Sequence, residues 1–134
     1  MQRVSRAAVR VEERSVAAIG PGLLVLLGVG QGDEEAAAER LAAKVRALRV
    51  FDDEHGRMNE PLGEREILCV SQFTLYGETR RGNRPSFVGA APPERAEALY
   101  EHFCACARAR HGVFGARMSV ELVNDGLVTL LVEG

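Results

Sequence analysis

The run Leu23–Val29 constrains the fold of this chain more than any other feature, because it contains no polar side chain. A strand with one wet face alternates apolar and polar residues, whereas a continuous apolar run predicts a strand that is buried on both faces. Gly20-Pro21-Gly22, directly before the run, predicts a turn. We therefore expect residues 23–29 at the centre of a β-sheet.

Further strands are expected around this central strand. Val4, Ala7, Val9 and Val11 roughly alternate with polar residues, and this period of two predicts a half-buried strand. Other strands are expected at residues 15–19, 50–51, 66–75, 116–123 and 127–132, with a turn at Asn124-Asp125-Gly126 between the last two.

Two helices are also predicted. The first follows Asp33, whose side chain is suited to cap it, and it buries a stripe that contains Leu41 and Val45. The second begins at Pro92-Pro93-Glu94, because proline is tolerated in the first turn of a helix, and Gly112 is expected to end it. Residues 52–61 are predicted to form an exposed loop.

Length and charge limit the classes of protein that fit. A chain of 134 residues is expected to form a single domain, residues 1–134, around one core. Its 46% hydrophobic and 27% charged residues are ordinary for a soluble globular protein. The net charge of -2 argues against a surface coated in positive charge, so any contact with RNA must be local.

The cysteines and histidines predict no metal and no cofactor. Cys104 and Cys106 are two residues apart on a predicted helix and so point to different faces, and the three histidines lack the spacing of zinc ligands. The odd number of three cysteines, with neither a secretory signal nor a membrane-spanning run, favours a cytoplasmic protein with no membrane contact.

The end of the predicted strand 66–75 is the best candidate for a functional site. There the apolar run Ile67–Val70 changes abruptly to Ser71-Gln72-Phe73-Thr74, which offers hydroxyls, an amide and backbone N–H groups. Arg80, Arg81 and Arg84 follow within one loop, and guanidinium groups suit phosphate oxygens. The simpler interpretation is a polar strand end that faces water; the three arginines favour a pocket for an anionic substrate.

Two other readings of the motifs carry less weight. Thr74 has no evident histidine or lysine nearby in the sequence to activate its hydroxyl as a nucleophile. Gly28-Val29-Gly30-Gln31-Gly32 imitates a dinucleotide-binding fingerprint, but its third glycine comes one residue early and two helices cannot build the paired halves of that fold. We expect these glycines to serve the exit of the strand, with nucleotide binding as a further alternative.

The chain resembles the D-aminoacyl-tRNA deacylases (DTD), with ordered matches along nearly its whole length. They are Gln2-Arg3-Val4, residues 22–29, Met58-Asn59, Ser71-Gln72-Phe73-Thr74-Leu75, Arg84-Pro85-Ser86-Phe87, Ala91-Pro92-Pro93, Phe114-Gly115-Ala116 with Met118, and Asn124-Asp125-Gly126 with Val128-Thr129. The resemblance implies an α/β fold with a small barrel-like sheet and two packed helices. It also implies a homodimer whose active sites lie at the subunit interface.

The implied substrate is tRNA esterified with a D-amino acid, and glycyl-tRNA is a second candidate. Ser71, Gln72, Phe73 and Thr74 correspond to the catalytic segment, and Arg80, Arg81 and Arg84 are our candidates for tRNA phosphates. The implied substrate-binding residues are Phe87, Phe114, Met118, Gly126 and Leu127. Backbone N–H groups around Phe73 and Thr74 would hold the oxyanion, and the ribose 2′-hydroxyl of the tRNA would activate water.

Leu127 departs from the family pattern, which has proline there with the peptide bond in cis. Because a non-proline cis bond costs about 2.5–4 kcal/mol, we expect trans at Leu127. Retained cis geometry, relaxed chiral selection and loss of deacylation are the three outcomes that follow. We favour a working hydrolase, and the alternative is a non-catalytic tRNA-end or protein-binding homologue.

Overall fold

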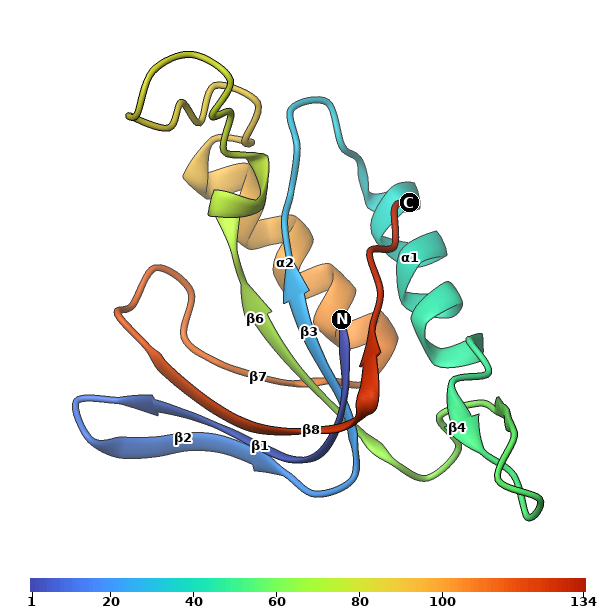
Figure 1. The fold of residues 1–134 in the computed structure, drawn as a ribbon. Coiled ribbons are helices and arrows are strands. Elements are labelled where there is room, and N and C mark those ends of the chain that lie inside the picture. Colours follow the sequence, from blue (N-terminus) through green and yellow to red (C-terminus); the bar gives the residue numbers. More distant parts are fainter.

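In the computed structural model of residues 1–134, the first five residues of the run, 23–27, lie in strand β3 (Gly22–Leu27), inside a six-stranded sheet. Figure 1 shows the sheet curling around the centre of the molecule. The strand order is β2-β1-β3-β6-β7, and β8 pairs with the other edge of β1. The bounds are β1 (Gln2–Val11), β2 (Arg14–Ile19), β6 (Glu66–Ser71), β7 (Arg110–His111) and β8 (Ser119–Thr129).

Strand β1 bends the sheet because it serves three neighbours. Its first residues, Gln2 to Val4, pair with β3, and its later residues, Ala7 to Val11, pair with β2. Strand β8 runs along the opposite edge of β1 over almost its whole length. This arrangement gives the barrel-like sheet that the resemblance implied.

The prediction of two C-terminal strands joined by a turn is wrong. Residues 119–129 form the single strand β8, which pairs with β1 on both sides of Asn124-Asp125-Gly126. Val4 pairs with Asn124 and Gln2 pairs with Thr129, so residues 125–128 stand opposite Arg3 alone. The turn residues therefore make a bulge in one strand rather than a hairpin between two.

The helices are α1 (Glu35–Ala47) and α2 (Pro93–Ala107). Strand β4 (Phe51–Asp52) overlaps the predicted strand 50–51, and it forms a small hairpin with β5 (Met58–Glu60), which falls in the predicted loop. Asp33 does not cap α1, because its carboxylate accepts the Gly30 N–H at 2.8 Å instead. Helix α2 ends before Gly112, because Arg108 takes the left-handed conformation (φ 55°) that stops it.

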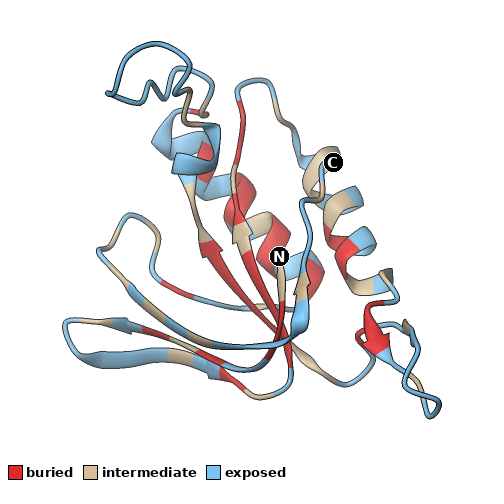
Figure 2. Cartoon of the chain, in the orientation of Figure 1, coloured by how far each residue is buried: buried red, intermediate tan, exposed pale blue.

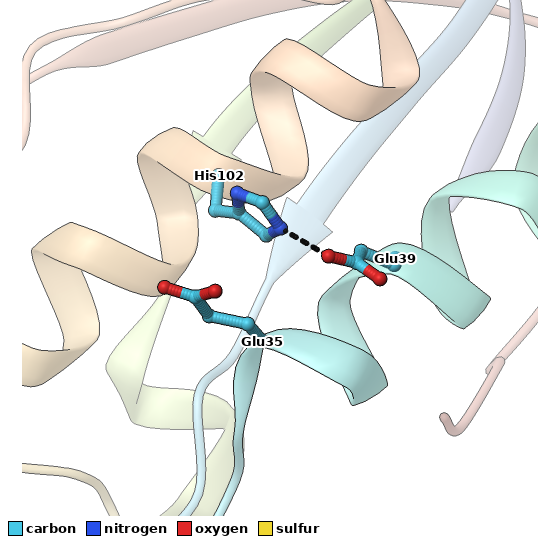
Figure 3. Close-up of side chains that lie close together, drawn as sticks. All are labelled: Glu35, Glu39 and His102. Atoms are coloured by element: carbon cyan, nitrogen blue, oxygen red, sulfur yellow. Dashed lines mark hydrogen bonds and ion pairs between the residues drawn. The ribbon is translucent and has the colours of Figure 1, made fainter.

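The helices also contact each other directly. Arg46 Nη1 of α1 donates to the Ala107 carbonyl at 2.8 Å, which satisfies one of the last carbonyls of α2. His102 of α2 meets Glu39 of α1 at 2.9 Å (Figure 3). Neither helix has the length and apolar composition that crossing a membrane would need.

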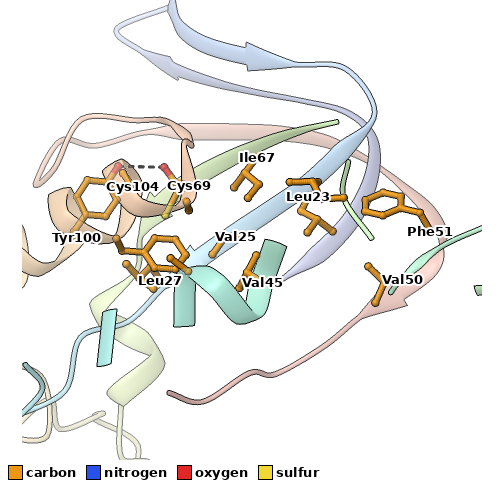
Figure 4. Packing of buried hydrophobic residues seen from close by; sticks show 14 residues of the cluster. Leu23, Val25, Leu27, Val45, Val50, Phe51, Ile67, Cys69, Tyr100 and Cys104 are labelled. Atoms are coloured by element: carbon orange, nitrogen blue, oxygen red, sulfur yellow. Dashed lines mark hydrogen bonds between the residues drawn. The ribbon is translucent and has the colours of Figure 1, made fainter. Parts of the chain in front are cut away.

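Both faces of β3 are buried, as the continuous apolar run predicted (Figure 2). Leu23, Val25 and Leu27 pack toward the helices, where Figure 4 shows them among Ile67, Cys69, Val45, Tyr100 and Cys104. The intervening Leu24 packs on the other side, with buried residues of β1, β2 and β6. Each fully buried Leu or Val side chain contributes about 1.5–3 kcal/mol, so this strand anchors both layers.

Candidate functional site

Strand β6 ends at Ser71, not at Leu75 as predicted, and the chain then turns into the 3₁₀-helix η1 (Phe73–Tyr76). The Gln72 N–H still donates to the Leu27 carbonyl at 2.8 Å, so Gln72 continues the contact with β3. Beyond it the side chains turn outward, with Phe73 56% and Leu75 51% exposed. The polar segment is therefore at the surface and not sealed in the core.

The start of η1 leaves two backbone donors outside its hydrogen-bond pattern. The first bond of the turn runs from the Leu75 N–H to the Gln72 carbonyl at 3.3 Å, so the N–H groups of Phe73 and Thr74 precede it. The Thr74 hydroxyl accepts a bond from the Gln72 side-chain amide. This arrangement can hold a developing oxyanion through backbone donors, and it places no base on the Thr74 hydroxyl.

The glycine motif after β3 supports η1. A Cβ on Gly30 would lie 2.7 Å from the Tyr76 hydroxyl oxygen, and one on Gly28 would lie 3.1 Å from the Tyr76 ring. The missing side chains thus make room for the ring of Tyr76. Strand-exit packing, rather than a dinucleotide, explains the spacing of these glycines.

The loop after η1 folds back over it. Glu78 and Ser86 exchange backbone hydrogen bonds of 2.7 and 2.9 Å, which returns the chain toward its starting point. Phe87 then meets Phe73 edge-to-face, with ring centroids 5.0 Å apart. The loop therefore places the predicted substrate-binding Phe87 directly beside the predicted catalytic segment.

The three arginines of this loop are not equivalent. Arg80 donates through Nε and Nη2 to the Glu78 carboxylate at 2.8 and 2.7 Å, and these bonds hold the pKa of Glu78 below its ordinary value. Arg81 and Arg84 are exposed, and neither forms an ion pair within the chain. Two guanidinium groups are thus free for an anionic ligand.

Phe114 and Met118 are both half-buried. Phe114 packs near the ring of Tyr100, at a centroid distance of 5.9 Å, and Met118 packs on the cluster inside the barrel. Strand β7 brings this segment to the edge of β6, through the pairing of Cys69 with His111. The structure thus places the segment beside the strand that ends at Ser71, with both side chains partly in the core.

The bulge that carries Leu127 is fixed by a residue that the sequence did not single out. Arg3 is only 6% exposed, and its Nε donates to the Asp125 carbonyl at 3.0 Å while Nη1 donates to the Val50 carbonyl at 2.8 Å. The Gly126–Leu127 peptide bond is cis, which corrects the expectation of trans. Leu127 itself is 77% exposed.

One signal in the sequence could have drawn attention to Arg3. It is a long cationic side chain within a predicted half-buried strand. Sequence pattern alone did not give its partners, because the acceptors lie on Val50 and Asp125, far along the chain. Gly126 faces the same guanidinium, since a Cβ there would lie 2.7 Å from Arg3 Nη2. Its φ of 131° is a second reason for glycine at this position.

A cavity of about 640 Å³ lies next to η1. Its walls come from β3, α1, η1 and the C-terminal residues 129–134, and they include Leu75 and Tyr76 but none of Ser71 to Thr74. The predicted catalytic segment therefore lies outside this cavity, on the open surface that carries Phe73 and Phe87.

Comparisons with known proteins agree along the whole chain. The family model described as D-Tyr-tRNA(Tyr) deacylase matches residues 1–133. A D-aminoacyl-tRNA deacylase of Koribacter versatilis is 56% identical, covering 99% of this chain and 94% of the relative. One from Myxococcus xanthus is 53% identical, covering 99% and 92%.

Solved structures give the same fold. The c-Myc DNA Unwinding Element Binding Protein superposes with a TM-score of 0.92 at 41% identity, covering 99% of this chain and 95% of the other. A probable eukaryotic D-amino acid tRNA deacylase superposes with a TM-score of 0.77 at 17% identity, a likeness of fold alone that covers 94% and 92%. From the match over residues 1–133, the chain belongs to the D-Tyr-tRNA(Tyr) deacylase family.

Proposed function

We propose that this protein is a D-aminoacyl-tRNA deacylase, which hydrolyses the ester between a D-amino acid and tRNA and so proofreads translation. The observation that carries the proposal is the exposed start of η1, where the Phe73 and Thr74 N–H groups precede the first bond of the turn. Full-length relatives named D-aminoacyl-tRNA deacylase support the same reaction. Nothing in the comparisons favours the non-catalytic alternative.

In the proposed reaction, water attacks the acyl carbon and the carbonyl oxygen becomes an oxyanion; when this intermediate collapses, the acyl–oxygen bond breaks and the ribose hydroxyl of the tRNA leaves with a proton, which frees the D-amino acid. The Phe73 and Thr74 N–H groups are the donors for that oxyanion, and one such donor is typically worth about 10²–10³-fold in rate. No histidine or lysine contacts the Thr74 hydroxyl, which accepts its bond from Gln72. The 2′-hydroxyl of the terminal ribose is therefore the group proposed to activate water. In this proposal Thr74 is a hydrogen-bonding residue and not the nucleophile.

The acting form in this proposal is a homodimer in the cytoplasm. Two exposed apolar groups support it, because an isolated chain would leave both in water. They are Phe73, Leu75, Phe87 and Val88 around η1, and Leu127, Leu130 and Leu131 at the end of β8. In the dimer, Gly126 and Leu127 of one protomer would enter the pocket of the other and exclude L-amino acids.

The acceptor end of the tRNA is proposed to contact Arg81 and Arg84. Both side chains are exposed without an acidic partner in the chain. Arg80 is the weakest candidate of the three predicted residues, because the Glu78 carboxylate already occupies its guanidinium. An exposed ion pair is worth only about 0–1 kcal/mol, so a phosphate can still compete for Arg80.

The test is a deacylation assay with D-Tyr-tRNA, L-Tyr-tRNA and Gly-tRNA. We expect hydrolysis of D-Tyr-tRNA far above the uncatalysed rate, with L-Tyr-tRNA spared. Hydrolysis of D- and L-Tyr-tRNA at equal rates would refute the chiral filter. Binding of tRNA without hydrolysis of any of the three would support the non-catalytic homologue instead.

A further inference from the structure

A cluster of four side chains with metal-binding chemistry lies between the two helices, away from η1. Glu35 and Glu39 come from α1, and His102 and Cys106 come from α2. Each pair is spaced four residues apart, so both members of a pair point from the same face of their helix. Figure 3 shows the Glu39 carboxylate directed at the imidazole across the gap between the helices, with the Glu35 carboxylate extending toward α2 below the ring in this view.

The distances centre on the Nε2 atom of His102. Glu39 Oε1 lies 2.9 Å from it and Cys106 Sγ lies 3.8 Å from it. One ligand atom each from Glu35, Glu39 and His102 falls within 4.8 Å of the others. In a tetrahedral zinc site with bonds of about 2.0–2.3 Å, neighbouring ligand atoms are roughly 3.3–3.8 Å apart. Small side-chain rotations would therefore bring Glu35, Glu39 and His102 around one ion. Cys106 lies outside that group of three and contacts only His102, at 3.8 Å, so its side chain would have to turn toward the ion to complete the site.

The exposure of these residues makes such rotations possible. Glu35, Glu39 and Cys106 are exposed, and His102 is half-buried. The helices beneath them are already fixed to each other, since Arg95 Nη2 donates to the Asp33 carbonyl at 2.6 Å and Arg46 Nη1 to the Ala107 carbonyl at 2.8 Å. The backbone frame of the cluster is thus in place before any ion binds.

A plain surface ion pair between Glu39 and His102 is the competing explanation. It requires a protonated imidazole, whereas a metal requires the neutral one. The ion pair uses only two of the four groups and gives no role to Glu35 or Cys106. A thiolate, an imidazole and two carboxylates are a donor set that suits zinc better than calcium or magnesium, which prefer oxygen ligands alone.

The geometry points to a zinc-class site formed by Glu35, Glu39, His102 and Cys106. The ion would join α1 to α2 on the outside of the helical layer, so its role is structural. The predicted catalytic segment starts at Ser71, on the end of β6, and no residue of the cluster belongs to it. Deacylation by the metal-free protein is therefore independent of this site.

The experiment titrates the full chain, stripped of metal by a chelator, with Zn²⁺ in a calorimeter and with Co²⁺ in a spectrophotometer. We expect one Zn²⁺ per chain, and a Co²⁺ spectrum with tetrahedral ligand-field bands and thiolate charge transfer. His102→Ala and Cys106→Ser should each weaken Zn²⁺ binding by about tenfold or more. Saturating Zn²⁺ should raise the Tm by roughly 5–10 °C.

The matched control is His55→Ala. Its imidazole also faces a carboxylate, Glu54, at 3.5 Å, but belongs to no group of three candidate ligands. This variant should bind Zn²⁺ like the unmodified chain. If His102→Ala does not fold, as judged by circular dichroism, Glu39→Gln replaces it.

Three results would overturn the site. They are the absence of one-equivalent Zn²⁺ binding, binding that His102→Ala and Cys106→Ser leave unchanged, and a Co²⁺ spectrum without thiolate charge transfer. Deacylation of D-Tyr-tRNA is measured on the same metal-free variants. If the unmodified chain does not hydrolyse D-Tyr-tRNA, that result counts against the proposed function and not against the metal site. The two proposals can therefore fail separately.

Discussion

Replacing Arg3 with methionine tests whether one buried guanidinium holds the bulge that carries Leu127. Methionine keeps the unbranched stem of arginine and removes all of its donors. The Val50 and Asp125 carbonyls lose the bonds of 2.8 and 3.0 Å that Arg3 donates to them. The bulge, residues 125–128, then has no side chain of β1 to fix it, because Arg3 is the residue that stands opposite it.

The size of the effect follows from these bonds. Each hydrogen bond from a charged donor is worth about 1.5–3 kcal/mol, and Arg3 makes two to backbone carbonyls. Its ion pairs with Asp52 and Asp125 add less, because both carboxylates are 57% exposed. Removing the guanidinium also relieves its own desolvation, so we expect a net loss of about 3 kcal/mol, or roughly 10 °C in Tm for a domain of this size.

The rate of deacylation should also fall, even at a temperature where the variant is still folded. If Leu127 completes the pocket of a partner subunit, a shift of about 1 Å in the bulge is enough to reduce the rate on the order of 10²-fold. The assay compares D-Tyr-tRNA deacylation and urea unfolding of Arg3→Met and Arg3→Lys. Lysine keeps the charge but has no planar fork to reach both carbonyls, so it should rescue only part of each loss.

The control is Arg10→Met on the same strand. Arg10 is 49% exposed and meets Glu121 at 3.8 Å, a surface pair that contributes about 0–1 kcal/mol. This variant should unfold and react like the unmodified chain. If Arg3→Met proves as stable and as active as Arg10→Met, the guanidinium does not hold the bulge and the reasoning is refuted.

Three further predictions concern the predicted catalytic segment and the residues around it. Gly30→Ala should reduce deacylation and lower the Tm, because its Cβ would lie 2.7 Å from the Tyr76 hydroxyl and push η1 away; unchanged kinetics would contradict this support role. The double variant Arg81→Ala, Arg84→Ala should weaken tRNA binding. It should also reduce the magnitude of the slope of log K against log salt concentration by up to about 1.4–1.8, since each lost phosphate contact removes roughly 0.7–0.9. An unchanged slope would exclude these contacts. Thr74→Ala should keep measurable deacylation, because its hydroxyl accepts from Gln72 and has no base, whereas complete loss with an intact fold would identify Thr74 as the nucleophile.

The parts of the fold that the sequence predicted are those set by local pattern. The run Leu23–Val29 reports burial on both faces, and β3 has that burial in the sheet. Pro93 at the start of α2 is a similarly local signal, since proline fixes the backbone of a first turn. The change from apolar to polar residues at Ser71 is another local signal, but the strand was predicted to continue to Leu75, whereas β6 ends at Ser71.

The errors come where partners distant in sequence decide the structure. Asn124-Asp125-Gly126 has the composition of a hairpin turn, yet both flanks pair with β1 and none with each other. Asp33 is an error of a different kind, because its carboxylate accepts from the Gly30 N–H, only three residues earlier, instead of capping α1. At residues 124–126, composition indicated a change of direction and tertiary pairing decided its form.

The cluster between the helices shows the same limit for metal ligands. Cys106 lies four residues after His102, but two side chains alone do not predict a metal site, and the Glu39 carboxylate that contacts His102 is 63 positions away in the sequence. Spacing rules detect ligands that come from one turn or one loop. They miss ligands that two helices bring together only after the sheet has packed beneath them.

The positions of Leu127 and Thr74 in one chain explain why the proposed filter needs a second protomer. The bulge faces Arg3, which pairs with Leu23, whereas Ser71 pairs with Leu27 at the other end of β3. Four residues of strand span about 13 Å, and the bulge lies a further three strands across the sheet, at about 4.8 Å per strand. A side chain reaches only a few ångströms beyond its backbone, so Leu127 is out of reach of the predicted catalytic segment of its own chain. The exposed Leu127 and the exposed Phe73 can then meet only between two copies, and in this proposal chiral selection is a property of the dimer.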